Sequence, residues 1–335
     1  MTSDLETAAP AGIRGSPLVA IVGPTAAGKS ALGIAVARRF GGEVVCCDST
    51  QVYRRFDIGT GKVTPAEQQG IPHHLMDLLE PDGIFTAGDY RGHALAVLQD
   101  LQRREKLPVF TVGTGLYLRA LLEGLSDAPT RSDELRERLR RLADARGHEH
   151  LHRILSRLDP AAAKRIASRD VAKIIRALEV RLLSGKPITE LHRAGRPALE
   201  GFRAVKIGLT PPRAALYQRI ERRIDAMFAA GWLDEVKALA AAGIPSRAKP
   251  FQFIGYGELR AHLAGVITLE AAVSAIRQAT RRYAKRQLTW FRKEQGVRWF
   301  AGFGDDPTIA TGVIEYLTEQ LTHTQASRAP LSGGV

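Results

Sequence analysis

The sequence predicts an α/β fold built on a parallel β-sheet, with an all-helical part inserted into it. Three features of the chain support this prediction. Short apolar runs, typical of buried parallel strands, occur at residues 18–22, 43–47 and 107–112. Segments with helical spacing separate these runs, which gives the strand–helix–strand order of right-handed crossovers. Residues 131–185 show helical periods and contain no strand-like run.

The elements of the sheet follow one another in the first part of the chain. The apolar run 18–22 ends at a glycine, and the helical pattern over residues 30–40 stops at Gly41. The second strand, 43–47, is followed by a helical stretch over residues 89–104, which leads into the third strand. We therefore expect parallel strands whose carboxyl ends lie on one edge of the sheet.

The later part of the chain is predicted to be mostly helical. Asp159 and Pro160 suit the N-cap and first position of one helix, and Asp170 can cap the next. An apolar stripe follows Asp170 and ends before Gly185. The run 205–209 is predicted to return the chain to the sheet. Two further helices are expected, over residues 214–230 and 269–293.

These elements divide the 335-residue chain into a discontinuous core and an insertion. The length alone suggests about two domains. We expect the sheet core to comprise residues 17–128 and 200–321 and the helical insertion to comprise residues 129–199. Residues 1–16 and 322–335 are predicted to be disordered tails.

The composition excludes several classes of protein. Apolar residues make up 44% of the chain, as in a globular domain. The net charge of +13 points to an anionic partner. Cys46 and Cys47 are adjacent and are the only cysteines, which excludes a disulfide framework and a four-cysteine zinc site. No signal peptide or membrane helix is evident, so we expect a cytoplasmic protein without a membrane partner.

The most specific motif is Gly23-Pro24-Thr25-Ala26-Ala27-Gly28-Lys29-Ser30, which fits G-x-x-x-x-G-K-[ST]. It lies between a predicted strand and a predicted helix, as a phosphate-binding loop requires. Glycines let backbone N–H groups converge on one phosphate, and the helix N-terminus adds a favourable dipole. Lys29 supplies a positive charge, and the Ser30 hydroxyl can ligate Mg²⁺. The motif predicts binding of a phosphate or diphosphate; the alternative is a chance glycine-rich turn.

Two further groups follow the ends of predicted strands, where open α/β sheets bind ligands. Asp48 could hold Mg²⁺ through water or act as a base, or it could only cap the following turn. The small residues Gly113-Thr114-Gly115 permit close approach of a ligand, or they form an ordinary turn between a strand and a helix.

Two histidine motifs are candidates for metal binding. The segment His148-Glu149-His150-Leu151-His152 matches H-E-x-x-H, and its spacing would place His148 and His152 on one helical face. Its charged surroundings and the lack of a third ligand favour a solvated helix surface over a zinc site. His73 and His74 could be ligands or could have a structural role.

A basic segment extends over residues 277–298, with eight lysines and arginines against the single acid Glu294. At helical spacing, Arg277, Arg281 and Lys285 form a ridge that suits a phosphate backbone. Because the segment has so few acids of its own, contact with nucleic acid is favoured over a solvated basic surface.

Eight short motifs stand in order along the chain. They are GPTAAGKS at 23–30, DSTQVY at 48–53, DIGTGK at 57–62, PHHL at 72–75, GTGLY at 113–117, RALEV at 176–180, IGY at 254–256 and TRRYAKRQLTWF at 280–291. This series, across about residues 18–300, resembles the tRNA dimethylallyltransferase (tRNA isopentenyltransferase, IPP transferase) family. The scarcity of cysteines excludes the zinc finger of some eukaryotic members and favours the bacterial type.

The resemblance implies a P-loop NTPase-like (kinase-like) core with a helical insertion that contacts tRNA, and Mg²⁺ as cofactor. It implies transfer of a dimethylallyl group from dimethylallyl diphosphate to N6 of an adenosine. That adenosine stands immediately 3′ of the anticodon (position 37) in tRNAs reading codons that begin with U. The implied partners are dimethylallyl diphosphate and the anticodon stem-loop of tRNA, and we expect a monomer.

The resemblance also implies roles for individual residues. Asp48 would orient N6 and accept its proton, with Arg223 and Thr25 as further catalytic residues and Arg219 as the fallback for Arg223. The loop Gly23 to Ser30 would bind the diphosphate leaving group in place of a nucleoside triphosphate. Contacts with tRNA are implied at Asp48, Ser49, Thr50, Gln51, Thr114, Arg136, Ala172, Lys173, Ile174, Ile175, Arg176, Gln252, Phe253, Ile254, Gly255, Tyr256 and Gly257. The basic ridge adds Arg281 and Lys285 to this set.

The chain departs from the family pattern at four positions. Ala27 stands where many members carry a serine, Gly61 and Val63 replace an alanine and a proline, and Val112 replaces a glycine. Two other functions remain open. A small-molecule P-loop kinase would share the loop and Asp48 but would leave the basic segment unused. A nucleic-acid-stimulated ATPase or binding module is the other.

Overall fold

The computed structural model describes residues 15–193 and 198–326, with side chains placed up to residue 322. The chain divides into two compact units, the first comprising residues 1–122 and 200–335 and the second residues 123–199. The boundary at residue 123 lies a few residues before the one expected from the sequence. Of the expected tails, residues 1–14 and 327–335 lie outside the described residues.

The first unit contains a six-stranded sheet with the order β3-β2-β4-β1-β5-β6, in which the neighbouring strands pair in parallel. The strands are β1 (Ser16–Val22), β2 (Glu43–Cys47), β3 (His73–His74), β4 (Pro108–Val112), β5 (Phe202–Leu209) and β6 (Val297–Phe300). After the second unit, the chain returns to the sheet as β5, which pairs with every residue of β1. The four strands expected from apolar runs are confirmed, and Ser16 belongs to β1 although it was assigned to the tail.

Both edge strands were missed by the sequence analysis. β3 consists of two histidines, and β6 is a four-residue strand with an exposed arginine. Neither carries the buried apolar run that identifies an inner strand, because an edge strand packs on fewer neighbours. Residues 297–300, which follow the expected helix over 269–293, therefore extend the sheet beside β5.

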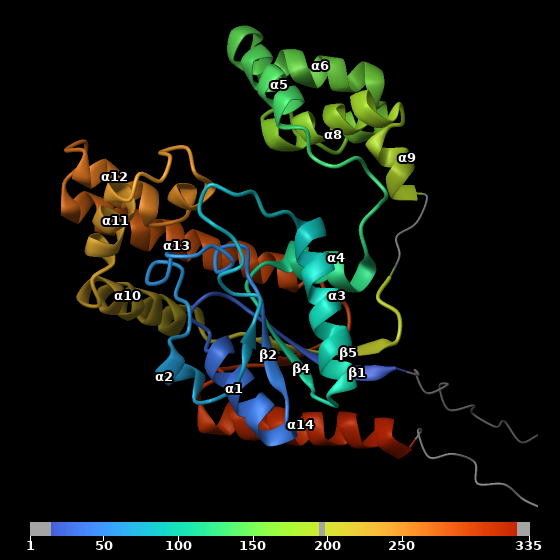
Figure 1. Cartoon of the computed structure of the whole chain (residues 1–335), viewed down its shortest axis with the longest axis vertical. Coiled ribbons are helices and arrows are strands. Elements are labelled where there is room, and N and C mark those ends of the chain that lie inside the picture. Colours follow the sequence, from blue (N-terminus) through green and yellow to red (C-terminus); the bar gives the residue numbers. More distant parts are fainter. Residues whose placement is uncertain (1–14, 194–197, 327–335) are drawn as a thin grey trace, which may run out of the picture. The chain divides into compact units, whose positions relative to one another are not determined.

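Helices cover both faces of the sheet (Figure 1). On one face, α1 (Lys29–Phe40) and α14 (Pro307–Ala326) contact each other, α1 against β4 and α14 against β5. Val313 and Leu317 of α14 are fully buried with Val19 and Ile21 of β1. The other face carries α3 (Ala87–Arg103) and α4 (Gly115–Glu123). Since α14 continues to Ala326, the expected C-terminal tail does not begin at residue 322.

A helical layer of the same unit adjoins the carboxyl edge of the sheet. Its helices are α10 (Arg213–Ala229), α11 (Trp232–Ala241), the 3₁₀ turn η1 (Lys249–Gln252), α12 (Tyr256–Leu263) and α13 (Leu269–Phe291), whereas the short helix α2 (Pro65–Gln68) lies beside α1 (Figure 1). Trp232, Tyr256 and Phe251 pack there against Val52 and Phe56, which lie in the loop after β2. This apolar cluster anchors the loops that carry the candidate site.

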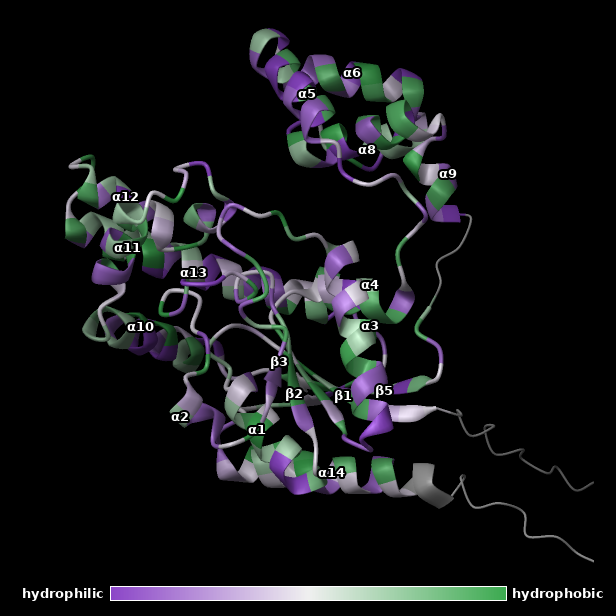
Figure 2. Ribbon diagram, viewed as in Figure 1, coloured by the Kyte–Doolittle hydropathy of each residue, from purple (hydrophilic) through white to green (hydrophobic). Residues whose placement is uncertain are grey.

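The second unit is helical throughout, as expected. Its helices are α5 (Asp133–Arg146), α6 (His148–Leu158), α7 (Pro160–Ala163), α8 (Val171–Ser184) and α9 (Ile188–Arg193). Asp159 and Asp170 cap α7 and α8 through their side chains, and Gly185 ends α8 in the left-handed region with φ 71°. Figure 2 shows hydrophobic residues on these helices, and Leu151, Leu155, Ile174 and Leu178 form their buried core. Over the described residues, no helix is both long and apolar enough to cross a bilayer.

Candidate functional site at the carboxyl edge of the sheet

The phosphate loop has the context that its motif predicts. Residues 23–30 follow β1 and open α1. The chain curls through positive φ angles at Gly23 (152°), Ala26 (62°) and Gly28 (84°). Gly28 is the N-cap residue of α1 and has no side chain of its own to cap it. The first turn of α1 therefore presents N–H groups that can donate hydrogen bonds to an anion.

Lys29 holds this loop closed. Its ammonium donates to the carbonyl oxygens of Gly23 (3.0 Å) and Pro24 (2.8 Å). Burial lowers the pKa of Lys29 to about 8, while the negative charge of Asp48 opposes that shift. A cation in such surroundings gains from a bound anion, as a diphosphate-binding lysine does.

Asp48 lies directly after β2, next to the loop that follows β4. Its Oδ1 accepts hydrogen bonds from the backbone N–H (2.9 Å) and the hydroxyl (2.7 Å) of Thr50. Its Oδ2 lies against the Cα of Gly113 and makes no hydrogen bond with the described residues. Asp48 thus stabilises the following turn with one oxygen and leaves the second available for a substrate.

The turn after β4 is tied to the turn after β2. The Thr114 hydroxyl accepts from the Ser49 backbone N–H at 3.0 Å and donates to the Ser49 hydroxyl at 3.1 Å. The backbone N–H groups of Gly113 and Thr114 both donate to the carbonyl oxygen of Cys47. Asp48 and Thr114, which the sequence placed on separate strands, therefore share one edge of the sheet.

Arg223 enters the same region from α10. Its Nη2 lies so close to Gly61 that a Cβ at position 61 would be 1.9 Å away. Burial lowers the pKa of Arg223 and the negative charge of Asp48 raises it, so the two groups are electrostatically coupled. Among the described residues, no hydrogen bond or ion pair engages Arg223. Arg219, one turn earlier, instead forms a bidentate ion pair with Asp305, with both distances 2.7 Å.

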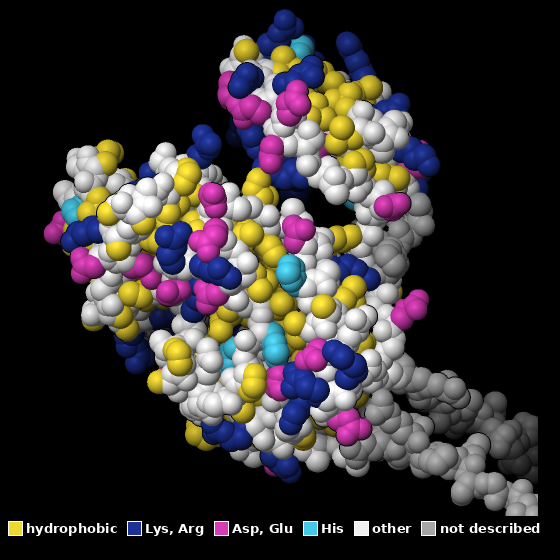
Figure 3. All heavy atoms as spheres, viewed as in Figure 1, with side chains coloured by type: hydrophobic (Ala, Val, Ile, Leu, Met, Phe, Trp, Pro, Cys, Tyr) yellow, Lys and Arg dark blue, Asp and Glu magenta, His cyan; other side chains and the backbone are white. Residues whose placement is uncertain are grey.

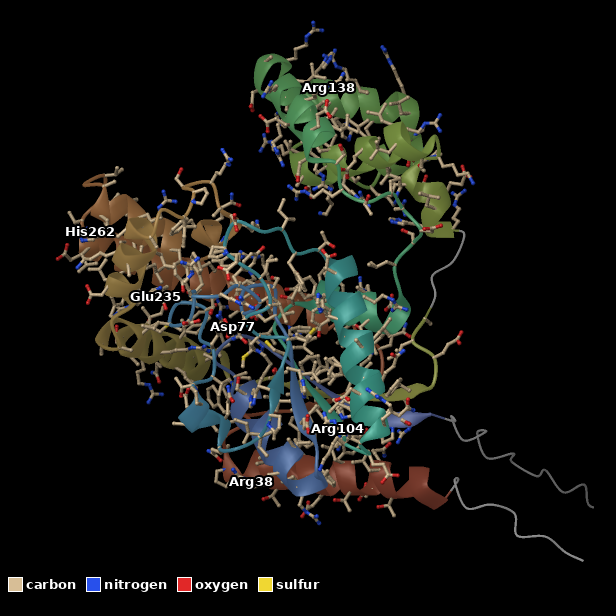
Figure 4. The ribbon with its side chains drawn as sticks, viewed as in Figure 1. Arg38, Asp77, Arg104, Arg138, Glu235 and His262 are labelled. Carbon is tan, nitrogen blue, oxygen red and sulfur yellow. The ribbon has the colours of Figure 1, made fainter. Side chains whose placement is uncertain are left out.

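Residues 57–62, which include the glycine against Arg223, are held by several side chains. Glu235 on α11 accepts from the backbone N–H groups of residues 57, 58 and 59. The single ammonium group of Lys62 pairs with the carboxylates of both Asp57 and Asp77. Figure 4 labels Glu235 and Asp77 on the segments that hold this loop. Gln51 was expected to contact tRNA, but its amide group donates to the carbonyl oxygens of Thr60 and Gly61 and accepts from Cys46.

The sequence analysis did not single out Gln287, a buried residue of α13. Its Oε1 accepts from the Thr25 backbone N–H at 2.7 Å, and its Nε2 donates to the Gly113 carbonyl oxygen at 2.8 Å. It lies within the motif at 280–291, between basic residues that drew attention to surface charge. Gln287 lies at helical spacing from Ala284 and Phe291, on the buried face of α13. A polar residue on an apolar helix face is the pattern that could have identified it.

Several residues expected to contact tRNA have structural roles. In the first unit, Tyr256 is fully buried and donates to Glu235 at 2.6 Å, whereas Gln252 and Gly257 are exposed. In the second unit, Ile174 and Ile175 are part of the apolar core. Their side chains are not available to a partner, although the neighbouring Ala172 and Lys173 are exposed.

Arg136 and Arg176 of the second unit converge on one buried carboxylate. Arg136 binds both oxygens of Glu179 at 2.8 Å, and Arg176 binds Oε2 at 2.6 Å. The Ser132 backbone N–H also donates to Glu179. Burial opposes ionisation of Glu179, but these hydrogen bonds lower its pKa to about 2. Both arginines, expected at the tRNA interface, are thus part of an internal ion-pair network.

The basic ridge on α13 is compensated by acids from another helix. Arg277 pairs with Asp225 at 2.5 Å and Arg281 with Glu221 at 2.8 Å, both acids being on α10. The ridge is therefore partly neutralised by acids outside the segment, which the composition of residues 277–298 could not indicate. Figure 3 likewise shows lysines and arginines beside acidic side chains over much of the visible face.

Unpaired positive charge gathers instead toward the end of α13. Lys285 lines a hollow of about 330 Å³ whose other lining residues are Arg119, Arg286, Thr289, Trp290 and Lys293. The Arg119 guanidinium lies over the Trp290 ring at 4.7 Å and pairs with Glu294. Lys285, Arg286 and Lys293 form no ion pair with the described residues. This hollow therefore brings several cationic side chains together on one surface of the first unit.

Histidines of both motifs contact other groups of the protein. Over the described residues, no group of three His, Cys, Asp or Glu side chains is placed to hold a metal ion. His152 on α6 contacts the carbonyl oxygens of Ala163 and Ile166, so it has a structural role within the helical unit. His74 contacts Glu43, which also binds Arg104 near the amino end of β2 (Figure 4).

Comparison with known proteins gives one consistent result. Residues 51–294 match the sequence model of the family described as IPP transferase. The chain is 52% identical to the tRNA dimethylallyltransferase of Koribacter versatilis, over 90% of this chain and 97% of that protein. It is 47% identical to the tRNA dimethylallyltransferase of Solibacter usitatus, over 91% and 99% of the two chains.

Two solved structures extend this likeness to the fold. The full-length tRNA isopentenylpyrophosphate transferase from Bacillus halodurans superposes with a TM-score of 0.69 at 37% identity, over 93% of this chain and 98% of that one. A eukaryotic dimethylallyltransferase acting on tRNA superposes with a TM-score of 0.78 at 25% identity, over 95% and 81%.

Proposed function

The chain belongs to the IPP transferase family, and we propose that it transfers a dimethylallyl group from dimethylallyl diphosphate to N6 of a tRNA adenosine. The observation that carries this proposal is the position of Asp48. Its available Oδ2 lies at the edge of the sheet where the phosphate loop begins, and its charge is coupled to Lys29 and Arg223. A base and an anion site are thus side by side.

The phosphate loop and its cations would hold the leaving group. The bond between C1 of the dimethylallyl group and the diphosphate oxygen breaks as charge develops on that oxygen. Loop N–H groups, Lys29 and the guanidinium of Arg223 stabilise this charge. Thr25 would add a contact from within the loop. The absence of an acid partner for Arg223 among the described residues supports this assignment over Arg219, which Asp305 already engages.

Asp48 would act on the acceptor. The N6 lone pair is delocalised into the adenine ring, which makes this amine a poor nucleophile. As the bond between N6 and C1 forms, Oδ2 of Asp48 accepts the N6 proton. The two hydrogen bonds from Thr50 to Oδ1 fix the carboxylate in the orientation that this transfer requires.

The residues at the loop are suited to Mg²⁺. The Ser30 hydroxyl stands at the start of α1 and makes no hydrogen bond with the described residues. Hydroxyl and carboxylate oxygens are the ligands that Mg²⁺ prefers, usually together with phosphate oxygens and water. Ser30 would hold the ion directly. The ion would supply further neutralisation of the diphosphate charge.

The adenosine immediately 3′ of the anticodon is the proposed target, in tRNAs reading codons that begin with U. It must leave the base stack to reach Asp48, as in other enzymes that modify bases. We expect Ser49, Thr50 and Thr114 to contact the extruded nucleotide from the edge of the sheet. Gln252, Gly257 and the cationic hollow around Lys285 would contact neighbouring parts of the anticodon stem-loop, and the protein would act as a monomer in the cytoplasm.

A labelling experiment tests the proposal against kinase activity. The protein is incubated with Mg²⁺, unmodified tRNA and labelled dimethylallyl diphosphate, without ATP. We expect label in the RNA and none when the target adenosine is replaced by guanosine. Absence of label from a competent tRNA, together with phosphoryl transfer from ATP to a small molecule, would instead establish the P-loop kinase alternative.

A further inference from the structure

Gln287 connects the two halves of the candidate site from within the protein. Only 6% of this residue is exposed. Its side-chain oxygen accepts from Thr25 N–H (2.7 Å), and its side-chain nitrogen donates to the Gly113 carbonyl oxygen (2.8 Å). Because a peptide N–H can only donate and a carbonyl can only accept, the two contacts fix the orientation of the amide.

The two partners of Gln287 serve different substrates. Thr25 belongs to the loop proposed to bind the diphosphate, whereas Gly113 lies against Oδ2 of Asp48, the proposed base. Tyr283, one helical turn before Gln287, also donates to the Gly113 carbonyl oxygen, at 3.3 Å. One face of α13 therefore contacts both loops.

The phosphate loop has a local need for such a contact. Ala26 adopts φ 62°, in the left-handed region that residues other than glycine enter only at a cost. The peptide held by Gln287 is that of Thr25, immediately before this turn. Without the side-chain oxygen, a partly buried N–H would lose its partner and the turn would lose its restraint.

We propose that Gln287 is a positioning residue, which holds the Thr25 backbone and the Gly113 turn at the spacing that brings the diphosphate and the acceptor amine together at Asp48. It acts through these two loops without touching either substrate. The inference rests on the proposed function for the identity of the substrates, but the link between α13 and the phosphate loop can be tested separately.

The test compares three variants with the unmodified protein. Gln287→Met keeps the volume of the side chain and removes both hydrogen bonds. Gln287→Glu, in its ionised form, keeps an acceptor for Thr25 N–H and has no donor for the Gly113 carbonyl oxygen. Gln278→Met is the matched control, because Gln278 is exposed on the same helix. Calorimetry with inorganic diphosphate, steady-state transfer kinetics, tRNA binding and hydrogen exchange are measured for each.

We expect Gln287→Met to weaken diphosphate binding and raise KM for dimethylallyl diphosphate by about tenfold. It should also lower kcat and accelerate exchange in residues 23–30, while exchange along α13 and tRNA affinity stay unchanged. Gln287→Glu should keep the loop protected but lower kcat, and Gln278→Met should match the unmodified protein.

Unchanged diphosphate affinity and loop exchange in Gln287→Met would overturn the proposal. So would faster exchange along the whole of α13, which would indicate a purely structural role. If the unmodified protein transfers no label while Gln287→Met still loses diphosphate affinity, the positioning role stands and the proposed function is wrong.

Discussion

Gly113 and Asp48 are in direct contact, with Oδ2 of Asp48 occupying the space where a side chain at position 113 would begin. A Cβ at Gly113 would lie 1.9 Å from this oxygen and 2.8 Å from the carboxyl carbon. Gly113 is not among the glycines with positive φ, so its backbone conformation does not require glycine. The close approach of the Asp48 carboxylate does. The relationship explains why small residues follow β4 opposite an acid that follows β2.

Gly113→Ala should therefore disable catalysis without unfolding the protein. The added methyl group displaces the Asp48 carboxylate, and we expect transfer to fall by about a hundredfold or more, with little change in tRNA affinity. Gly92→Ala is the control, since nothing lies within 4 Å of a Cβ at this helical position. Single-turnover rates measure the effect, and a Gly113→Ala variant with normal rates would show that the position of Asp48 is not critical.

Replacing Arg219 and replacing Arg223 should have different effects on catalysis, although the two residues lie one helical turn apart. Arg223→Ala removes a cation with no acid partner among the described residues, so we expect kcat to fall by about a hundredfold. Arg219→Ala breaks the ion pair with Asp305 and should have a much smaller effect, equal to that of Asp305→Asn. Steady-state kinetics of the three variants decide this, and a larger loss in Arg219→Ala would reverse the assignment.

Donor binding should weaken as the pH rises through the pKa of Lys29. This pKa is lowered to about 8 by burial, so the ammonium loses its proton above that pH in the ligand-free protein. A diphosphate binds the protonated form more tightly, and therefore KM for the donor is expected to increase above about pH 8. Lys29→Met should bind the donor weakly at every pH. An identical pH profile in this variant would exclude Lys29 as the titrating group.

The ion-pair network of the second unit should determine its stability. Glu179→Ala leaves Arg136 and Arg176 without their shared carboxylate, and we expect a loss of about 2–4 kcal/mol in unfolding free energy. The folded pKa of Glu179, about 2, lies below its ordinary value. The network's contribution is therefore complete above about pH 5 and is lost as the pH falls toward 2.

Denaturation monitored by hydrogen exchange in residues 133–184 measures this loss. The control is Glu137→Ala, which removes exposed pairs with Arg140 and Arg141 on the same unit. Equal stability of the two variants would show that the buried network contributes no more than a surface ion pair does.

Local patterns predicted the inner strands, the phosphate loop and the helical insertion because each depends on a short segment of sequence. Long-range pairing could not be read in the same way. The acids that neutralise Arg277 and Arg281 are some 50–60 positions away on α10, and Gln287 reaches Thr25 across 262 positions. Burial changed other expectations, since Ile174, Ile175 and Tyr256 belong to apolar cores. Arg136 was predicted to contact tRNA from the family resemblance alone. The resemblance could not indicate that Arg136 forms an ion pair with buried Glu179.

The most direct test of the account concerns Asp48 itself. Single-turnover transfer of labelled dimethylallyl from its diphosphate to saturating tRNA is compared for the unmodified protein and Asp48→Ala, with tRNA and inorganic diphosphate affinities measured in parallel. The account predicts that Asp48→Ala abolishes transfer while it binds both ligands nearly as well as the unmodified protein does. Transfer at a comparable rate in Asp48→Ala, or loss of activity explained fully by loss of tRNA binding, would contradict the assignment of Asp48 as the base.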